Sequence, residues 1–390
     1  MNEAYIVAAG RAAGGKKGGR LKDWHPADLG GAMVDALLDR SQADPEVVED
    51  VIWGCVSQVA EQAANIGRQV ALASRLPEHV PGVSIDRQCG SSQQALHFAA
   101  QAVMAGVMDV VIAGGVESMT RVPMGLNTVF PTQHGYGHYK GPRVSARYPG
   151  ITFSQFAGAN MMVGKYGLTK QELDYFSLES HQRAAEATRQ GRFSDEIIPV
   201  TVIDPEGGEM LHTSDEGIRL DASIEAIAAV KKLADDGDLT AANASQICDG
   251  ASGVLVANEA GLKKLGRAPL ARIHQMTVTG GNPVVMLETP IAATRAALAR
   301  AGMQISDIDL YEVNEAFASV PLAWLKELDA DPARLNVNGG AIALGHPLGA
   351  SGTKLMSTLL YALRARGGRY GLLTMCEGGG LANVTIVERL

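Results

Sequence analysis

The sequence repeats one order of apolar runs and glycine-rich turns near its two ends, and this repeat constrains the fold most. Overlaying the two parts aligns residues 49–55 (EDVIWGC) with residues 308–314 (IDLYEVN). The next distinctive residue is Cys89 in one part, 34 positions after residue 55, and His346 in the other, 32 positions after residue 314. A period above a hundred residues is too long for a solenoid and predicts an internal duplication. Two unrelated domains with a similar rhythm are the alternative.

Short apolar runs alternate with stretches of helical spacing along most of the chain, which predicts an α/β fold. Predicted strands cover residues 5–9, 51–55, 83–85, 110–113, 250–257, 310–313, 336–338 and 371–375. Predicted helices cover residues 27–38, 93–104, 171–190, 290–300 and 351–364.

The middle of the chain interrupts this rhythm, with an irregular stretch, long helical segments and a turn at residues 204–208 (DPEGG). We expect residues 1–120, completed by about 246–269, to form one half and residues 270–390 the other. Residues 121–245 are then an inserted loop domain that covers a site.

Bulk properties exclude several classes of protein. A net charge of −8 argues against general binding of nucleic acids or anionic membranes, although a local basic pocket for a small polyanion is compatible with it. No apolar run reaches the ~20 residues of a membrane helix, and the first residues (MNEAYIVAAG) lack a basic leader. The four cysteines are widely spaced, so disulfides and structural zinc are weak interpretations and a reducing cytoplasm is expected.

Two cysteines stand where chemistry is plausible. Cys89 precedes a predicted helix, whose free N–H groups and dipole favour a thiolate. Cys376 directly follows the predicted strand 371–375. It is followed by Glu377 and three glycines beginning with Gly378, whose backbone amides could bind an oxyanion. A buried cysteine that only packs is the commoner alternative for each of them.

His346 and Asn314 are the other candidates. His346 lies in a glycine-rich turn, and Pro347 restricts its backbone to extended geometry, so its imidazole could deprotonate a thiol. Asn314 follows a predicted strand, where its amide could orient a water or polarise a carbonyl. A surface-loop histidine and a helix-capping asparagine are the alternatives.

Two other motifs fail. Gly10, Gly15 and Lys16 nearly match a phosphate-binding loop, but Lys17 replaces the hydroxyl residue that magnesium requires. His134 and His138 lack nearby carboxylate or cysteine partners, so we expect no metal site.

Four blocks together resemble the signatures of thiolases, in order and spacing, over essentially the whole chain. They are the Cys89 segment, residues 314–318 (NEAFA), residues 336–352 and residues 376–380 (CEGGG). The resemblance implies a thiolase fold, with two duplicated βαβαβαββ halves in five αβαβα layers and an inserted loop domain. It also implies a homodimer or homotetramer and, since coenzyme A is a substrate, no cofactor.

The resemblance implies CoA-dependent cleavage of a 3-oxoacyl-CoA to acetyl-CoA and a shortened acyl-CoA, or the reverse condensation. Cys89 would be the acylated nucleophile, His346 its base, and Cys376 the acid and base for the acetyl-CoA carbanion. His346 with a water held by Asn314 would form one oxyanion hole, and the N–H groups of Cys89 and Gly378 the other.

Ser245 and Arg219 match the family's contacts to the pantetheine and nucleotide ends of CoA. Residues 153–158 (FSQFAG) replace the Met-Gly step usual near the acyl group in acetoacetyl-CoA-type relatives. We therefore expect longer or bulkier acyl chains, ring-derived ones included.

Three rival interpretations remain. An acetoacetyl-CoA-specific acetyltransferase differs only in acyl preference. A ketosynthase-like condensing enzyme would typically lack the second cysteine, and a non-catalytic acyl-CoA-binding relative should have lost Cys89, His346 or Cys376.

Overall fold

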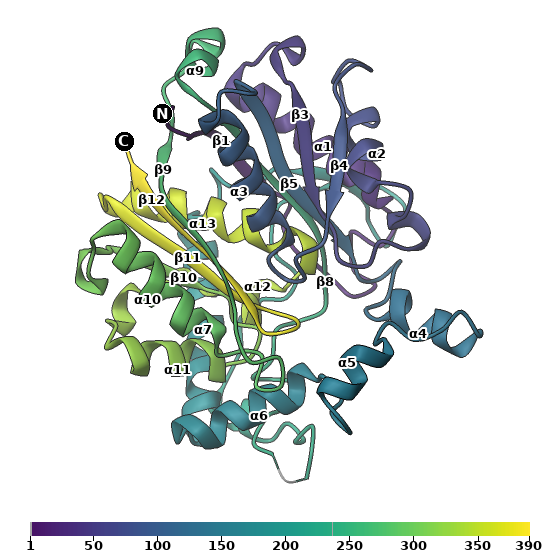
Figure 1. Ribbon diagram of the computed structural model, residues 1–390, viewed down its shortest axis with the longest axis vertical. Coiled ribbons are helices and arrows are strands. Elements are labelled where there is room, and N and C mark those ends of the chain that lie inside the picture. The colour runs from purple at the N-terminus through teal and green to yellow at the C-terminus, as the bar shows by residue number, and fades with distance from the viewer. Residues whose placement is uncertain (1, 236) are drawn as a thin grey trace.

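A computed structural model describes residues 2–235 and 237–390 and contains one 10-stranded sheet (Figure 1). Its strands follow the order β10-β11-β12-β9-β1-β8-β5-β3-β4, and the short β2 (Gly15–Lys16) pairs with β8. Strands β1 and β9 pair through only two positions, Tyr5 with Arg272 and Ile6 with Ala271. The sheet therefore consists of two parts joined at a short seam.

The two parts have the same internal order, as the duplication predicts. The first contains, in space, β4 (Gly82–Ile85), β3 (Asp50–Gly54), β5 (Val110–Ser118), β8 (Cys248–Ala257) and β1 (Tyr5–Arg11). The second contains β10 (Leu310–Val313), β11 (Tyr370–Glu377), β12 (Leu381–Arg389) and β9 (Ala271–Gly280). In each part the early strands pair in parallel and the last strand runs antiparallel between its neighbours.

Residues 336–338 were predicted as a strand, and this prediction is wrong. Around this segment there are only isolated parallel bridges, between Tyr311 and Leu335 and between Val337 and Gly339. Asn336 then adopts a positive φ of 42°, and its side-chain amide exchanges two hydrogen bonds of 2.9 Å with the backbone of Val313. The amide thus takes the place of the backbone groups that a continuing strand would offer.

The helices complete five layers. One outer layer contains α1 (Pro26–Ser41) and α2 (Ile66–Leu72), which pack on the first part of the sheet. The central layer contains α3 (Ser91–Met104) and α13 (Ser351–Arg366), which contact each other and strands of both parts. The other outer layer contains α10 (Thr289–Ala301), which packs on the second part, and α11 (Ser319–Leu328) beside it. The predicted thiolase architecture is confirmed.

Strand alternation decides which side chains enter which layer. In β11, Leu372 and Cys376 belong to the outer core with α10 and α11, whereas Leu373 and Met375 belong to the central core with α3 and α13. By the same alternation the next residue, Glu377, is directed toward the central layer.

The segment between β5 and β8 adds most of the remaining elements. They are α4 (Leu126–Gln133), α5 (Pro142–Arg147), α6 (Gln155–Tyr166), α7 (Lys170–Arg189), β6 (Val200–Ile203), β7 (Glu209–His212) and α8 (Ile224–Ala228). Helices α4 and α5 project from the body of the molecule (Figure 1). The predicted turn at residues 204–208 joins β6 to β7, with the Asp204 N–H donating to the Gly208 carbonyl at 2.8 Å. Two short helices lie elsewhere, α9 (Glu259–Leu265) and α12 (Ala341–Leu344).

Across the described ranges, no helix is both long enough and apolar enough to cross a bilayer.

Candidate active site

Cys89 lies in the tight turn between β4 and α3. Gln88 adopts a positive φ of 51°, a conformation that a residue with a side chain rarely takes, and its N–H donates to Asp86 Oδ1 at 2.6 Å. Gly90 is the N-cap of α3, so the thiol of Cys89 precedes the helix directly, as predicted. The side chain is buried. The strained turn places a reactive group at the positive end of a helix.

Cys376 is the penultimate residue of β11, and its side chain is also buried. The strand continues to Glu377, two residues beyond the predicted end at residue 375, before Gly379 and Gly380 turn the chain with φ of 83° and 80°. The backbone N–H groups of Cys89 and Gly378 both act on the Cys89 sulfur and oppose the rise that burial causes in its pKa. Two N–H donors therefore converge at this sulfur, which is the arrangement that an oxyanion hole requires.

The turn after α12 presents His346. Gly345 has φ 77° and ψ 161°, and the Cys248 side chain occupies the space that a β-carbon at residue 345 would need. Glycine is therefore required there. The His346 N–H donates to the Gln246 carbonyl at 3.0 Å, which fixes the backbone of the turn.

The imidazole of His346 is held between two polar side chains. Nδ1 lies 2.5 Å from Ser351 Oγ, whose own hydrogen is donated to the Pro347 carbonyl at 2.9 Å. The hydroxyl therefore accepts from Nδ1–H, which leaves a lone pair on Nε2. Nε2 lies 3.4 Å from Asn314 Nδ2. The tautomer is the one that a general base requires.

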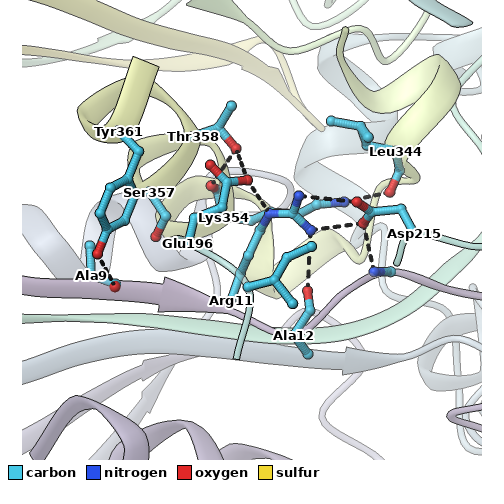
Figure 2. A network of polar contacts seen from close by, with 12 residues as sticks. Ala9, Arg11, Ala12, Glu196, Asp215, Leu344, Lys354, Ser357, Thr358 and Tyr361 are labelled. Carbon is cyan, nitrogen blue, oxygen red and sulfur yellow. Dashed lines mark hydrogen bonds and ion pairs between the residues drawn. The ribbon is translucent and has the colours of Figure 1, made fainter. Parts of the chain in front are cut away.

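A buried network of polar and charged side chains contacts the residues just before His346 (Figure 2). Lys354 on α13 donates from Nζ to the carbonyls of Leu344 and Gly345 at 2.6 and 2.9 Å. Beside it, Arg11 of β1 pairs with Glu196 at 2.6 Å and with Asp215 at 2.8 Å, all with side chains almost fully buried. The network ties the first strand, the middle segment and α13 to the residues just before His346.

The protonation states follow from burial. Desolvation, assisted by the positive charge of Lys354, lowers the pKa of His346 to about 3, so the imidazole is neutral near pH 7. Desolvation and the nearby Glu377 charge raise the pKa of Cys89 to about 12. Desolvation and then the charge of Cys89 raise the pKa of Cys376 far above its usual value. The resting site therefore contains two neutral thiols and a neutral base.

The predicted residues Cys89, Asn314, His346, Cys376 and Gly378 converge on one place. The Asn314 N–H donates to the Thr374 carbonyl at 3.1 Å, which puts Asn314 beside the end of β11 as well as beside His346. The N-termini of α3 and α13 also meet, since the Thr353 N–H donates to Ser92 Oγ at 3.1 Å. Turns far apart in the sequence thus form one site.

A pocket of about 520 Å³ leads to His346. The predicted CoA contact Ser245 lines it, whereas Arg219 is not among its lining residues. Arg219 lies exposed after β7, where its N–H donates to His181 Nδ1 at 3.2 Å. Apolar and polar walls complete the pocket; they include Lys16, Lys17, Met119, Met124, Gln155, Phe156, Phe317 and Leu348.

The two failed motifs lie largely in turns and other irregular segments of the chain. Lys16 belongs to the short strand β2 and is followed by turns, not by the helix of a phosphate-binding loop. His134 stacks on Phe130 with ring centroids 3.8 Å apart, and both it and His138 are exposed. Over residues 2–235 and 237–390, no group of three or more His, Cys, Asp or Glu is arranged to hold a metal ion.

Four supporting residues escaped sequence analysis. In the sequence, the polar face of a predicted amphipathic helix includes Ser351 and Lys354. The rejected phosphate-loop motif includes Lys16 and Lys17. Only the last pair carried a usable signal, because two adjacent lysines in a glycine-rich turn are suited to contact a phosphate.

The fold and the site together define an α/β enzyme in which two duplicated halves contribute two buried thiols and an imidazole, and the imidazole lines a pocket. The model of the thiolase N-terminal domain matches residues 4–260, and that of the thiolase C-terminal domain matches residues 267–389. The chain therefore belongs to the thiolase family, as the sequence predicted.

Individual relatives are similar over nearly their full length. A steroid 3-ketoacyl-CoA thiolase, FadA6 of Mycobacterium tuberculosis, is 51% identical, covering 100% of this chain and 95% of that protein. A 3-ketoacyl-CoA thiolase of Marinobacter nauticus is 39% identical, covering 97% and 95%. The crystal structure of the Bacillus anthracis acetyl-CoA acetyltransferase superposes with a TM-score of 0.91 at 35% identity, covering 100% of this chain and 99% of that one.

Proposed function

We propose that this enzyme cleaves 3-oxoacyl-CoA with free CoA to give acetyl-CoA and a shortened acyl-CoA. The observation that carries the proposal is the convergence of two buried thiols and a neutral imidazole whose Nε2 carries the lone pair, with only the long 3.4 Å contact from Asn314 Nδ2 on it. A non-catalytic acyl-CoA-binding protein would not require two thiols and a basic imidazole in one site. A ketosynthase-like enzyme would not need Cys376.

Each step of the cleavage reaction has a catalytic side chain positioned to carry it out. Cys89 Sγ attacks the 3-keto carbon while its proton passes to His346 Nε2. As the tetrahedral adduct collapses, the bond between C2 and C3 breaks, its electron pair passes to the acetyl-CoA enolate, and the Cys376 thiol protonates that carbon. The proton on His346 then passes to the Cys376 thiolate. His346 takes the proton of free CoA as the CoA sulfur attacks the acyl group on Cys89, passes it to the departing Cys89 thiolate, and the shortened acyl-CoA leaves.

Two oxyanion sites serve these steps. The N–H groups of Cys89 and Gly378 stabilise the oxygen of the adduct and of the acyl-cysteine. Asn314 Oδ1 is buried and makes no hydrogen bond with the described residues, so it is free to hold a water that, with His346, stabilises the enolate oxygen.

The pocket supports binding of CoA. Ser245 and the apolar walls suit the pantetheine arm, and the two lysines at residues 16 and 17 supply positive charge for its phosphates. Residues 121–245 would act as the unit that covers this site. Contact between Arg219 and the nucleotide stays a prediction.

Bulky acyl groups are the expected substrates. Phe156 lines the pocket in place of the Met-Gly step, next to Met119 and Met124, and the Mycobacterium tuberculosis relative is named for steroid substrates. We expect kcat/KM for thiolysis to be at least about tenfold higher with a long-chain or ring-bearing 3-oxoacyl-CoA than with acetoacetyl-CoA. Initial rates across a panel of such thioesters measure this, and a preference for acetoacetyl-CoA would favour an acetyltransferase.

We further infer a homodimer or homotetramer in the cytoplasm. The family resemblance supports the first, and four free, buried cysteines fit a reducing compartment.

Replacing Lys354 by methionine should lower kcat by about 10²-fold, because the His346 turn loses the donor that fixes two of its carbonyls. Loss of the positive charge should also raise the pKa of His346 and move the acid limb of the pH profile upward. Steady-state kinetics against pH measure both effects.

Lys326→Met is the matched control, since this exposed lysine also donates to a backbone carbonyl, that of Tyr166, but away from the site. Equal kinetics for Lys354→Met and Lys326→Met would remove Lys354 from the account.

A further inference from the structure

The duplication places two buried glutamates at equivalent positions, Glu117 near the end of β5 and Glu377 at the end of β11. Each lies against a glycine just before a central helix, Gly349 before α13 and Gly90 before α3. At both glycines a β-carbon would collide with the glutamate carboxyl. The two carboxyl groups therefore occupy the same place in the two halves.

Glu117 is fully satisfied where it lies. Its carboxylate accepts from the N–H groups of Val56, Ser57 and Gly349 at 2.9, 3.0 and 2.9 Å. It also accepts from Gln62 Nε2 at 3.0 Å. Four donors hold the carboxylate, which makes Glu117 a structural clamp between the halves.

Glu377 has lost these donors. It is completely buried, and neither carboxyl oxygen has a hydrogen-bond partner among the described residues. Its neighbours are instead the two reactive residues: Cys376 precedes it in the chain, and Gly90, against which its carboxyl packs, follows Cys89. A buried carboxylate without donors is unstable, whereas a protonated carboxyl is tolerated and can itself donate.

We propose that Glu377 is a positioning residue that controls the ionisation of Cys89 and Cys376: as a neutral acid it permits their thiolates, and as a carboxylate it suppresses them. The inference rests on the proposed function only in taking these two thiols as the reactive groups.

The charges around Glu377 set the direction of the effect. Burial raises the pKa of Glu377 to about 8, and the charge of the Arg87 guanidinium offsets this only in part; the Asn383 N–H group adds a smaller offset without forming a hydrogen bond to either carboxyl oxygen. The other titratable groups that interact with Glu377 are Cys89 before α3 and Cys376 on β11, and Cys89 is also subject to the charge of Glu117 on β5. Below pH 8 Glu377 is neutral; above it, the carboxylate opposes both thiolates, raising the pKa of Cys89 and of Cys376.

The test is the rate at which iodoacetamide alkylates Cys89 between pH 6 and pH 10, without substrate, with the modified peptide identified by mass spectrometry. In the wild type the rate should rise less steeply with pH above about 8, as Glu377 becomes charged. In Glu377→Gln, which keeps a neutral donor at every pH, the steep rise should continue. At pH 9 the variant should react about tenfold faster, equivalent to one pKa unit, and at pH 6.5 the two should agree within about twofold.

Glu117→Gln is the matched control and should keep the change of slope near pH 8. Parallel profiles for wild type and Glu377→Gln would overturn the proposal. A wild-type profile without a change of slope would also overturn it, and this second test does not depend on the variant folding. Thiolysis is measured separately, so an inactive enzyme with the expected alkylation profile would contradict the proposed function and leave the role of Glu377 intact.

Discussion

Replacing Cys89 by alanine should reduce kcat for thiolysis by at least about 10⁴-fold, while the enzyme still binds acyl-CoA. The thiol is the atom that becomes acylated, so its removal deletes the covalent pathway and leaves only binding and the N–H donors of the oxyanion site. A spectrophotometric assay of 3-oxoacyl-CoA consumption measures the rate, and calorimetric titration with CoA measures binding.

Cys55→Ala is the control for this variant. Cys55 is also buried, and it directly follows β3 in the first half as Asn314 directly follows β10 in the second. It should retain kcat within about threefold because it takes no part in the chemistry. If Cys89→Ala kept more than a few per cent of wild-type activity, Cys89 would not be the nucleophile.

Replacing Cys376 by alanine should separate the two kinds of chemistry. Cleavage of the carbon–carbon bond should fall by about 10³-fold or more, because no acid remains to protonate the acetyl-CoA enolate. Exchange of an acyl group between a saturated acyl-CoA and free CoA needs only Cys89 and His346, and should stay within about tenfold of wild type. Isotopically labelled CoA measures the exchange.

The discriminating quantity is the ratio of the two rates. A proportional loss of cleavage and exchange would mean that Cys376 supports the shape of the site and does not transfer a proton. An unchanged rate of cleavage would place the enzyme with single-cysteine condensing enzymes.

The sequence predicted the elements that carry the chemistry because each is local. The strand 310–313 is exact, and helices α3 and α13 begin within two residues of their expected starts. The exchange of hydrogen bonds between the Asn336 amide and Val313 depends on a fold already formed, so the predicted strand at 336–338 could not be excluded beforehand.

The supporting residues of the site were less accessible to sequence analysis. Lys354 looks like any lysine on a helix, and only the tertiary structure turns it inward to the carbonyls before His346. Glu377 carried only an indirect signal, since the offset that overlays residues 49–55 on 308–314 places Glu117 opposite residue 376, one position before it. The difference between them lies in their hydrogen-bond donors, which no alignment of one sequence with itself reveals.

The account depends on Cys89, His346 and Cys376 acting on one thioester, and trapping the acyl group tests this most directly. The wild-type enzyme is incubated with a 3-oxoacyl-CoA without free CoA, quenched in acid and analysed by peptide mass spectrometry. We predict the shortened acyl group on the peptide containing Cys89, absent after addition of CoA. An unmodified Cys89 during turnover, or an acyl group on Cys248 or Cys376 instead, would contradict the account.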